Sequence, residues 1–209
     1  MEIPKPELLQ LFPKPVLITK YHKDLSKELE YVKGLEHNLN KKEHDYAAQS
    51  SNTFLLDEPE LASVREFIEV YIKFYISNVL EWNGDLIITQ AWTNICEKGK
   101  KHHEHAHPNS IVSGVFYFQI DETLPPIEFK NTNNNSLSLE IKNQNNFNSA
   151  TFLLPLNSGE LILFPSNLVH SVPENKSDKP RISLAFNTFA KGSLGSECSL
   201  TYAPLNRCV

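Results

Sequence analysis

The chain has few cysteines, no long apolar run and no excess of basic residues. Its 209 residues include only three cysteines, Cys96, Cys198 and Cys208. Their odd number and their spacing fit neither a disulfide framework nor a zinc ribbon, so we expect a reducing, intracellular setting. Lys and Arg total 20 against 25 Asp and Glu, a formal net charge of −5. This balance disfavours a nucleic-acid partner bound mainly through its phosphates.

Signals for secretion and membrane insertion are also scarce. The first 20 residues, MEIPKPELLQLFPKPVLITK, lack the uninterrupted apolar stretch of a signal peptide. No window approaches the roughly 20 apolar residues of a membrane span. We therefore expect a soluble, cytoplasmic protein without a membrane partner. The length suits one substantial core, so residues 1–209 are predicted to form a single domain.

The first 84 residues are predicted to form a strand and supporting helices. Pro15–Tyr21 is a short run rich in β-branched residues and predicts a strand. From Lys23 to Leu39 apolar residues recur every three or four positions, which is helical spacing. A second helix is expected to start near Asp57-Glu58-Pro59, where acidic residues and proline suit a first turn, and to end before Asn83-Gly84.

After Gly84 the apolar stretches become short and are separated by turn residues, as in an antiparallel sandwich or barrel. Residues 85–190 are thus predicted to form a β core and residues 191–209 a C-terminal tail. The stretch 131–149 holds eight asparagines and no glycine, and predicts hairpins and exposed loops. The expected strands are Leu86–Ile95, Ile111–Ile120, Ile127–Phe129, Leu137–Lys142, Thr151–Pro155, Glu160–Phe164 and Arg181–Phe189.

Four of the eight histidines lie in one segment, HHEHAH, at residues 102–107. Imidazole is the commonest protein ligand for iron, zinc, copper and nickel, so the segment suggests a metal site. Because residues i and i+2 of a strand face the same way, three chelating pairs are open: His102 with Glu104, His103 with His105, or His105 with His107. A solvated histidine-rich loop is the alternative interpretation.

A distant third ligand and a carboxylate-binding pair make the metal interpretation more specific. His170 follows the apolar strand around ELILFPS and could close a facial site with open positions for oxygen and a cosubstrate. Arg181 and Ser183, in RISLAFN, share one face of a strand and could together bind a carboxylate. Taken singly, His170 and Arg181 are each better explained by an ordinary structural role.

The segments HAHPNSIVSGVFYF, GELILFPSNLVHSVPEN and PRISLAFN together resemble the 2-oxoglutarate/Fe(II) oxygenase superfamily, in particular a branch of small bacterial and phage proteins. TQAWTNICEKG, with Trp92 and Asn94, also fits that pattern. The resemblance covers about residues 85–190 and implies a mainly β protein with N-terminal helices around a double-stranded β-helix, the jelly-roll or cupin-like core. It implies Fe(II) and 2-oxoglutarate as cofactors.

The resemblance also implies a role for individual residues. The match to His-x-His-Pro followed by Ser-Gly-Val-aromatic-Tyr selects His105 and His107 as metal ligands, with His170 as the distal ligand. Arg181, helped by Ser183, would bind the distal carboxylate of 2-oxoglutarate. Tyr117 and Asn94 lie on strands that could also reach this cosubstrate. On this choice, His102, His103 and Glu104 are loop residues at the mouth of the barrel.

The chain departs from the superfamily's usual His-x-Asp/Glu, because His107 stands where the carboxylate is expected. Either three histidines bind the iron, or His107 lies beside the metal and water fills the third position. The implied reaction consumes 2-oxoglutarate and O2, releases succinate and CO2, and hydroxylates a prime substrate that is a protein, a peptide or a small molecule.

Two other functions remain open at this stage. A three-histidine cupin-type dioxygenase that does not need 2-oxoglutarate would share the same barrel. A non-catalytic jelly-roll binding module is the second alternative. Edge strands and the tail could support a homodimer without requiring one.

Overall fold

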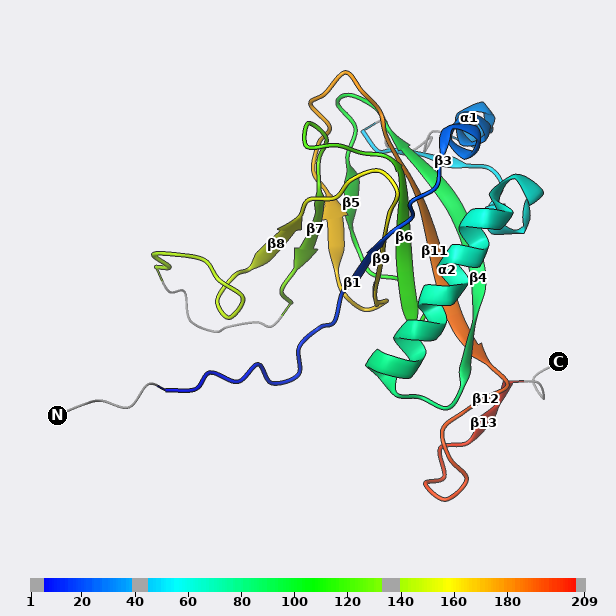
Figure 1. The fold of residues 1–209 in the computed structure, drawn as a ribbon. Coiled ribbons are helices and arrows are strands. Elements are labelled where there is room, and N and C mark those ends of the chain that lie inside the picture. The colour runs from blue at the N-terminus through cyan, green and yellow to red at the C-terminus, as the bar shows by residue number, and fades with distance from the viewer. Residues whose placement is uncertain (1–5, 39–44, 133–139, 206–209) are drawn as a thin grey trace.

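Two antiparallel sheets form the body of the protein in a computed structural model, which describes residues 6–38, 45–132 and 140–205. The larger sheet has the order β1-β9-β6-β11-β4-β3-β2 and the smaller one β5-β10-β7-β8. Figure 1 shows the smaller sheet on one side of the larger and α2 on the other. The strands of these two sheets are β1 (Leu17–Lys20), β2 (His37–Asn38), β3 (Ala48–Ser50), β4 (Asp85–Cys96), β5 (His102–His105), β6 (Val112–Gln119), β7 (Ile127–Lys130), β8 (Thr151–Leu154), β9 (Glu160–Pro165), β10 (His170–Val172) and β11 (Arg181–Lys191).

The expected helices are present. α1 (Ser26–Gly34) is shorter than predicted, because Leu35 is already extended and β2 begins at His37. The second helix begins with short 3-10 turns, η1 (Leu55–Asp57) and η2 (Pro59–Leu61), continues as α2 (Ala62–Tyr75) and ends in the π-turn η3 (Ile76–Leu80). α2 buries one face, formed by Val64, Ile68, Ile72 and Tyr75. No helix among the described residues is long and apolar enough to cross a membrane.

The central strands β6, β9 and β11 are buried on both faces, which explains their almost continuous apolar sequences. Alternate residues point to opposite sides of the sheet. On β6, Phe116 and Phe118 pack with the helices, whereas Val115 and Tyr117 pack toward the smaller sheet. On β11, Arg181, Ser183 and Ala185 line the space between the sheets, so one strand supplies both core and site.

Gly114 of β6 lies where a side chain cannot fit. A Cβ atom built there would overlap the ring of Phe186 and approach Leu163 Cδ2 to 2.8 Å. Both neighbours are fully buried, so an added methyl group would force closely packed side chains to shift. The glycine of SGVFYF therefore lets β6 pack closely under the ring of its neighbour on β11.

Several details differ from the sequence predictions. Of the expected strand Leu137–Lys142, residues 137–139 lie outside the described part and residues 140–142 are not in a strand. Six short strands were not predicted, because runs of two to four residues carry too little pattern. Four of them are β2, β3, β5 and β10. The others, β12 (Ser193–Leu194) and β13 (Ala203–Pro204), form a hairpin in the predicted tail.

Candidate active site

A cavity of about 310 Å³ opens between the two sheets. Its wall comes from the inner face of β4 and β11, from β5 with the segment that follows it, and from β10. Neither Asp nor Glu occurs among the described residues that line it. The polar lining consists of histidines, one arginine, and amide, hydroxyl, thiol and indole groups. A cavity with this lining suits an anionic ligand or a metal ion bound by nitrogen.

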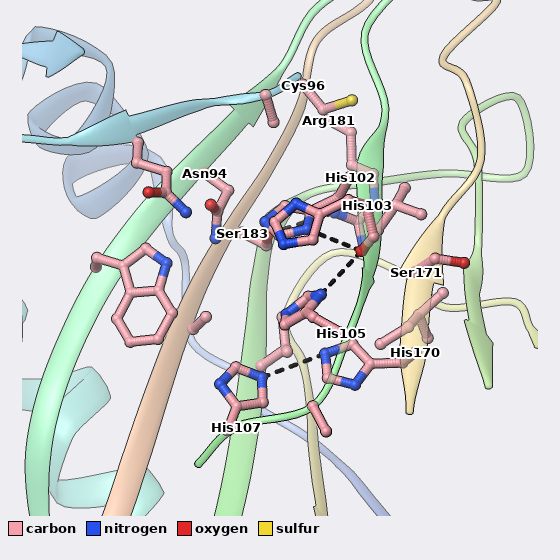
Figure 2. A pocket seen from close by; sticks show the side chains of 18 of the residues that line it. Asn94, Cys96, His102, His103, His105, His107, His170, Ser171, Arg181 and Ser183 are labelled. Atoms are coloured by element: carbon pink, nitrogen blue, oxygen red, sulfur yellow. Dashed lines mark hydrogen bonds between the residues drawn. The ribbon is translucent and has the colours of Figure 1, made fainter. Parts of the chain in front are cut away.

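Three histidines from two elements meet in this cavity (Figure 2). The pairing of β5 with β10 places His105 directly opposite His170. The centroids of the two rings are 4.4 Å apart, and that of His107 is 4.9 Å from the ring of His105 and 5.1 Å from that of His170. The nitrogens of these three side chains lie close enough together to hold one metal ion.

The hydrogen bonds of the rings direct the correct nitrogen inward. Nδ1 of His105 donates a hydrogen bond to the His103 carbonyl (2.8 Å), and Nδ1 of His170 donates one to the Leu168 carbonyl (2.9 Å). Each Nε2 then keeps a free lone pair. The Nε2 atoms of His107 and His170 are 3.3 Å apart. Two neighbouring ligands of one ion, with metal–nitrogen bonds of about 2.1 Å, are separated by about 3.0 to 3.4 Å, so the donor set fits a divalent ion.

Burial keeps these histidines neutral. It lowers the pKa of His170 to about 3, although the hydrogen bond to Leu168 acts in the opposite direction. Burial likewise lowers the pKa of His107 to about 4, with a further contribution from His105, and the pKa of His105 itself is also lowered, mainly by burial. Neutral imidazole is the form that binds metals, so this cluster does not need to lose protons near neutral pH.

His102 differs from its sequence prediction. It was expected in a loop, facing away from His105, but it lies on β5 and lines the cavity. The ladder with β10 pairs His170 with His105 and Val172 with His102, so β5 has one residue more than its partner and forms a bulge. A bulge shifts the alternation of side chains along a strand. The ring of His102 therefore lies 4.7 Å from that of His105.

The predicted cosubstrate residues form a row across three neighbouring strands. Asn94 of β4, Ser183 of β11 and Tyr117 of β6 are directly opposite one another in the ladders. Arg181 lies one inward-facing position away on β11. Its guanidinium donates to the Tyr117 hydroxyl (3.3 Å) and to Ser183 Oγ (3.4 Å), and it lies over the Tyr117 ring at 5.0 Å. The structure thus brings all four residues together.

Arg181 is a buried cation without an acidic partner. Only 3% of it is exposed, and no carboxylate forms an ion pair with it among the described residues. Its Nε atom and Asn94 Oδ1 are buried without a hydrogen-bond partner. Because a buried charge needs a counter-charge, this corner of the cavity fits a carboxylate ligand.

Tyr117 is placed differently from Arg181, Ser183 and Asn94. Those three residues line the cavity, whereas Tyr117 is fully buried behind Arg181. Burial raises the pKa of Tyr117, and Arg181 only partly offsets this. The phenol is therefore neutral, and its oxygen accepts a hydrogen bond from the guanidinium. Tyr117 therefore contacts the arginine rather than the open space.

Sequence reasoning did not assign Trp92 to the site. Its indole Nε1 is buried without a hydrogen-bond partner, and the side chain lines the cavity two residues before Asn94 on the same face of β4. The ring of His107 lies 6.2 Å from it. The alternation of β4 could have revealed this position, because Trp92, Asn94 and Cys96 must share one face.

The two sheets enclosing this cavity define a double-stranded β-helix fold, whose cavity holds a cluster of histidines and a buried arginine. Residues 90–187 match the sequence profile of a family described as "Putative 2OG-Fe(II) oxygenase". Over these residues the chain is similar to the 2OG-Fe(II) oxygenase family that its sequence motifs indicated. A comparison with curated proteins found no match.

Solved structures of such oxygenases have the same fold. A 2OG-Fe(II) oxygenase family oxidoreductase from Burkholderia pseudomallei is 11% identical with a TM-score of 0.58, covering 83% of each chain. HygX from Streptomyces hygroscopicus, solved with nickel, 2-oxoglutarate and hygromycin B, is 13% identical with a TM-score of 0.58, covering 84% of this chain and 82% of HygX. A Pseudomonas putida prolyl-4-hydroxylase is 12% identical with a TM-score of 0.59, covering 86% of this chain and 94% of the hydroxylase.

Proposed function

We propose that this protein uses Fe(II) and 2-oxoglutarate to hydroxylate a prime substrate. The reaction splits O2: one oxygen atom enters succinate as 2-oxoglutarate loses CO2, and the other enters the substrate as a hydroxyl group. The observation that carries the proposal is one cavity with two complementary ends. Three neutral histidines lie at one end and an unpaired, buried arginine at the other.

We propose His105, His107 and His170 as the iron ligands. The absence of any Asp or Glu from the described lining of the cavity favours the three-histidine site over one with a carboxylate. Glu104, the nearest acid in sequence, is exposed and lies 4.0 Å from Lys130. Iron(II) held by these side chains would supply the electrons that activate O2, and the remaining coordination positions would serve the cosubstrate and oxygen.

The other residues bind and orient the cosubstrate. Arg181 pairs with the distal carboxylate, with Ser183 as an additional donor. Tyr117 accepts a hydrogen bond from the guanidinium and holds it in place. Asn94 lines the cavity, where its amide nitrogen can donate to the cosubstrate. Positioning of this kind replaces solvent with fixed polar groups, so that the bound cosubstrate meets the metal in one orientation.

The main alternative is a cupin-type dioxygenase that needs no 2-oxoglutarate. It would use the same histidines but would have no need of an unpaired arginine at the far end of the cavity. The buried Arg181 therefore favours 2-oxoglutarate. The prime substrate stays a prediction: the similar folds include a prolyl-4-hydroxylase and an enzyme solved with hygromycin B, so a peptide and a small molecule both enter the test panel.

The test is anaerobic titration of the metal-free protein with Fe(II) and 2-oxoglutarate, followed by visible absorption. We expect the charge-transfer band of an iron-bound 2-oxo acid. Alanine at His105, His107 or His170 should abolish it. The band should survive His22→Ala, which removes an exposed histidine outside the cavity. A band retained by the His107 variant would instead mean that two histidines and water bind the iron.

The cosubstrate assignment needs a second assay. We expect succinate release to require 2-oxoglutarate and to be lost in Arg181→Ala. The control is Arg65→Ala, which removes an exposed arginine that pairs with Asp57 and Glu69. Oxygen uptake that is independent of 2-oxoglutarate would favour the cupin-type alternative. No iron binding at all would leave a non-catalytic binding module.

A further inference from the structure

A second group of histidines lines the same cavity. His102 and His103 stack on each other with ring centroids 5.0 Å apart, and His105 lies 4.7 Å from the first and 4.9 Å from the second. Their nitrogens are close enough together for one ion. We call His102, His103 and His105 the outer cluster, and His105, His107 and His170 the inner cluster. Figure 2 shows His105 between the two.

The bulge of β5 creates the outer cluster. In a regular strand His102 and His105 would face opposite ways, because they are three residues apart. The extra residue of β5 relative to β10 brings both rings to one side. His103 is exposed, and its ring contacts that of Tyr46 edge-on at 5.3 Å. It is therefore free to adjust its rotamer toward an ion.

The two clusters depend on a single atom. Nδ1 of His105 donates to the His103 carbonyl at 2.8 Å, which leaves only Nε2 to bind a metal. That lone pair serves one ion at a time. His102 Nδ1 lies 3.5 Å from the same carbonyl, so its Nε2 is likewise the available donor. Full coordination of an ion in either cluster thus deprives the other cluster of its third histidine.

We propose that His102, His103 and His105 form a second metal site, for divalent ions that favour imidazole such as Zn²⁺, and that it competes with the inner site for His105. Zinc binds in tetrahedral sites with histidine ligands, and water can fill a missing position. When both ions are bound, one of them keeps only two histidines. An excess of such a metal therefore weakens the hold of the inner cluster on its own ion.

The test is equilibrium dialysis of the metal-free protein against Zn²⁺, with the bound metal counted directly. The wild type should bind two ions, the second more weakly. His102→Ala/His103→Ala should bind one ion, tightly. His107→Ala/His170→Gln should also bind one ion. It should bind this ion at least about tenfold more tightly than the wild type binds its second ion, because His105 is no longer shared. The magnitude follows from the loss of about 10- to 100-fold in affinity when even an indirect partner of a metal ligand is removed. His22→Ala should match the wild type.

His105→Ala supplies a measurement that does not depend on the buried His170. It should weaken both ions together, which neither double variant does. The second site is refuted if His102→Ala/His103→Ala still binds two ions, or if His107→Ala/His170→Gln binds none while circular dichroism shows it folded. A different outcome tests the proposed iron site. If Zn²⁺ binds to His107→Ala/His170→Gln as it does to the wild type, but does not bind to His102→Ala/His103→Ala, the outer site exists and the inner one does not.

Discussion

Replacement of Arg181 by methionine should stabilise the protein and destroy its response to 2-oxoglutarate. Methionine fills a similar volume without a charge. The buried guanidinium has no acidic partner, and an uncompensated buried ion costs several kcal/mol. Its two hydrogen bonds, at 3.3 and 3.4 Å, are long and return about 0.5 to 1.5 kcal/mol each. Without 2-oxoglutarate, we therefore expect the free energy of unfolding of the variant to exceed that of the wild type by about 1 to 3 kcal/mol.

Addition of the cosubstrate should reverse this order. A ligand at 100 times its dissociation constant stabilises the native state by about 2.7 kcal/mol. With Fe(II) present in every sample under anaerobic conditions, added 2-oxoglutarate should stabilise the wild type by about this amount and the methionine variant not at all. Urea unfolding with and without the cosubstrate measures both effects. Arg65→Met, at an exposed ion pair, should lose no more than about 1 kcal/mol and keep the response.

Both expectations would be contradicted by an Arg181→Met protein that is less stable than the wild type without 2-oxoglutarate and gains equal stability from it. That result would mean that the arginine serves the core through its contacts with Tyr117 and Ser183, and that the cosubstrate binds elsewhere. A variant that is more stable than the wild type but is still stabilised by 2-oxoglutarate would support the cost of the buried charge. It would show that Arg181 does not bind the carboxylate of 2-oxoglutarate.

Three further predictions follow from the geometry. Gly114→Ala should destabilise the protein by about 1 to 3 kcal/mol in urea unfolding, because the added methyl meets the buried Phe186 ring. Tyr117→Phe should raise KM for 2-oxoglutarate about tenfold with little change in kcat, since it frees the guanidinium without touching the metal. Metal-free protein should lose stability as pH falls below about 6.5. Histidines of the unfolded chain then bind protons, whereas folded His107 and His170 do so only near pH 4 and pH 3. Each of the two therefore lowers the free energy of unfolding by up to about 1.4 kcal/mol per pH unit. Equal stability at pH 7 and pH 5 would contradict this.

The long strands were predicted from the sequence because each has enough residues for its pattern of apolar and polar positions to be recognised. β6 and β9 read as continuous apolar runs, the pattern of strands buried on both faces, and α2 shows a clear helical period. The four residues predicted to bind 2-oxoglutarate lie together because alternation along β4 and β11 fixes which side chains share a face. Their roles stay predictions until binding is measured.

The outer cluster could not be predicted in the same way. Simple alternation placed His102 on the far side of the strand from His105. The bulge that overturns this is a property of the pairing of β5 with β10, and neither strand was recognised from sequence. Strands of three or four residues acquire their register from neighbours far away in the chain. The local pattern HHEHAH therefore predicted candidate ligands without predicting their geometry.

The neutral side chain of His107 should affect the affinities for both Fe(II) and 2-oxoglutarate through the charge at the metal. With three neutral ligands, Fe(II) keeps its full positive charge, and Arg181 adds another in a cavity whose described lining has no acid. Such a site attracts a dianion strongly but holds the cation less tightly than a site with a carboxylate ligand would. His107→Asp should therefore shift the two affinities in opposite directions, tighter for Fe(II) and weaker for 2-oxoglutarate, as measured by anaerobic titration of each. A purely steric change would weaken both, and parallel losses would show that His107 does not set the charge at the metal.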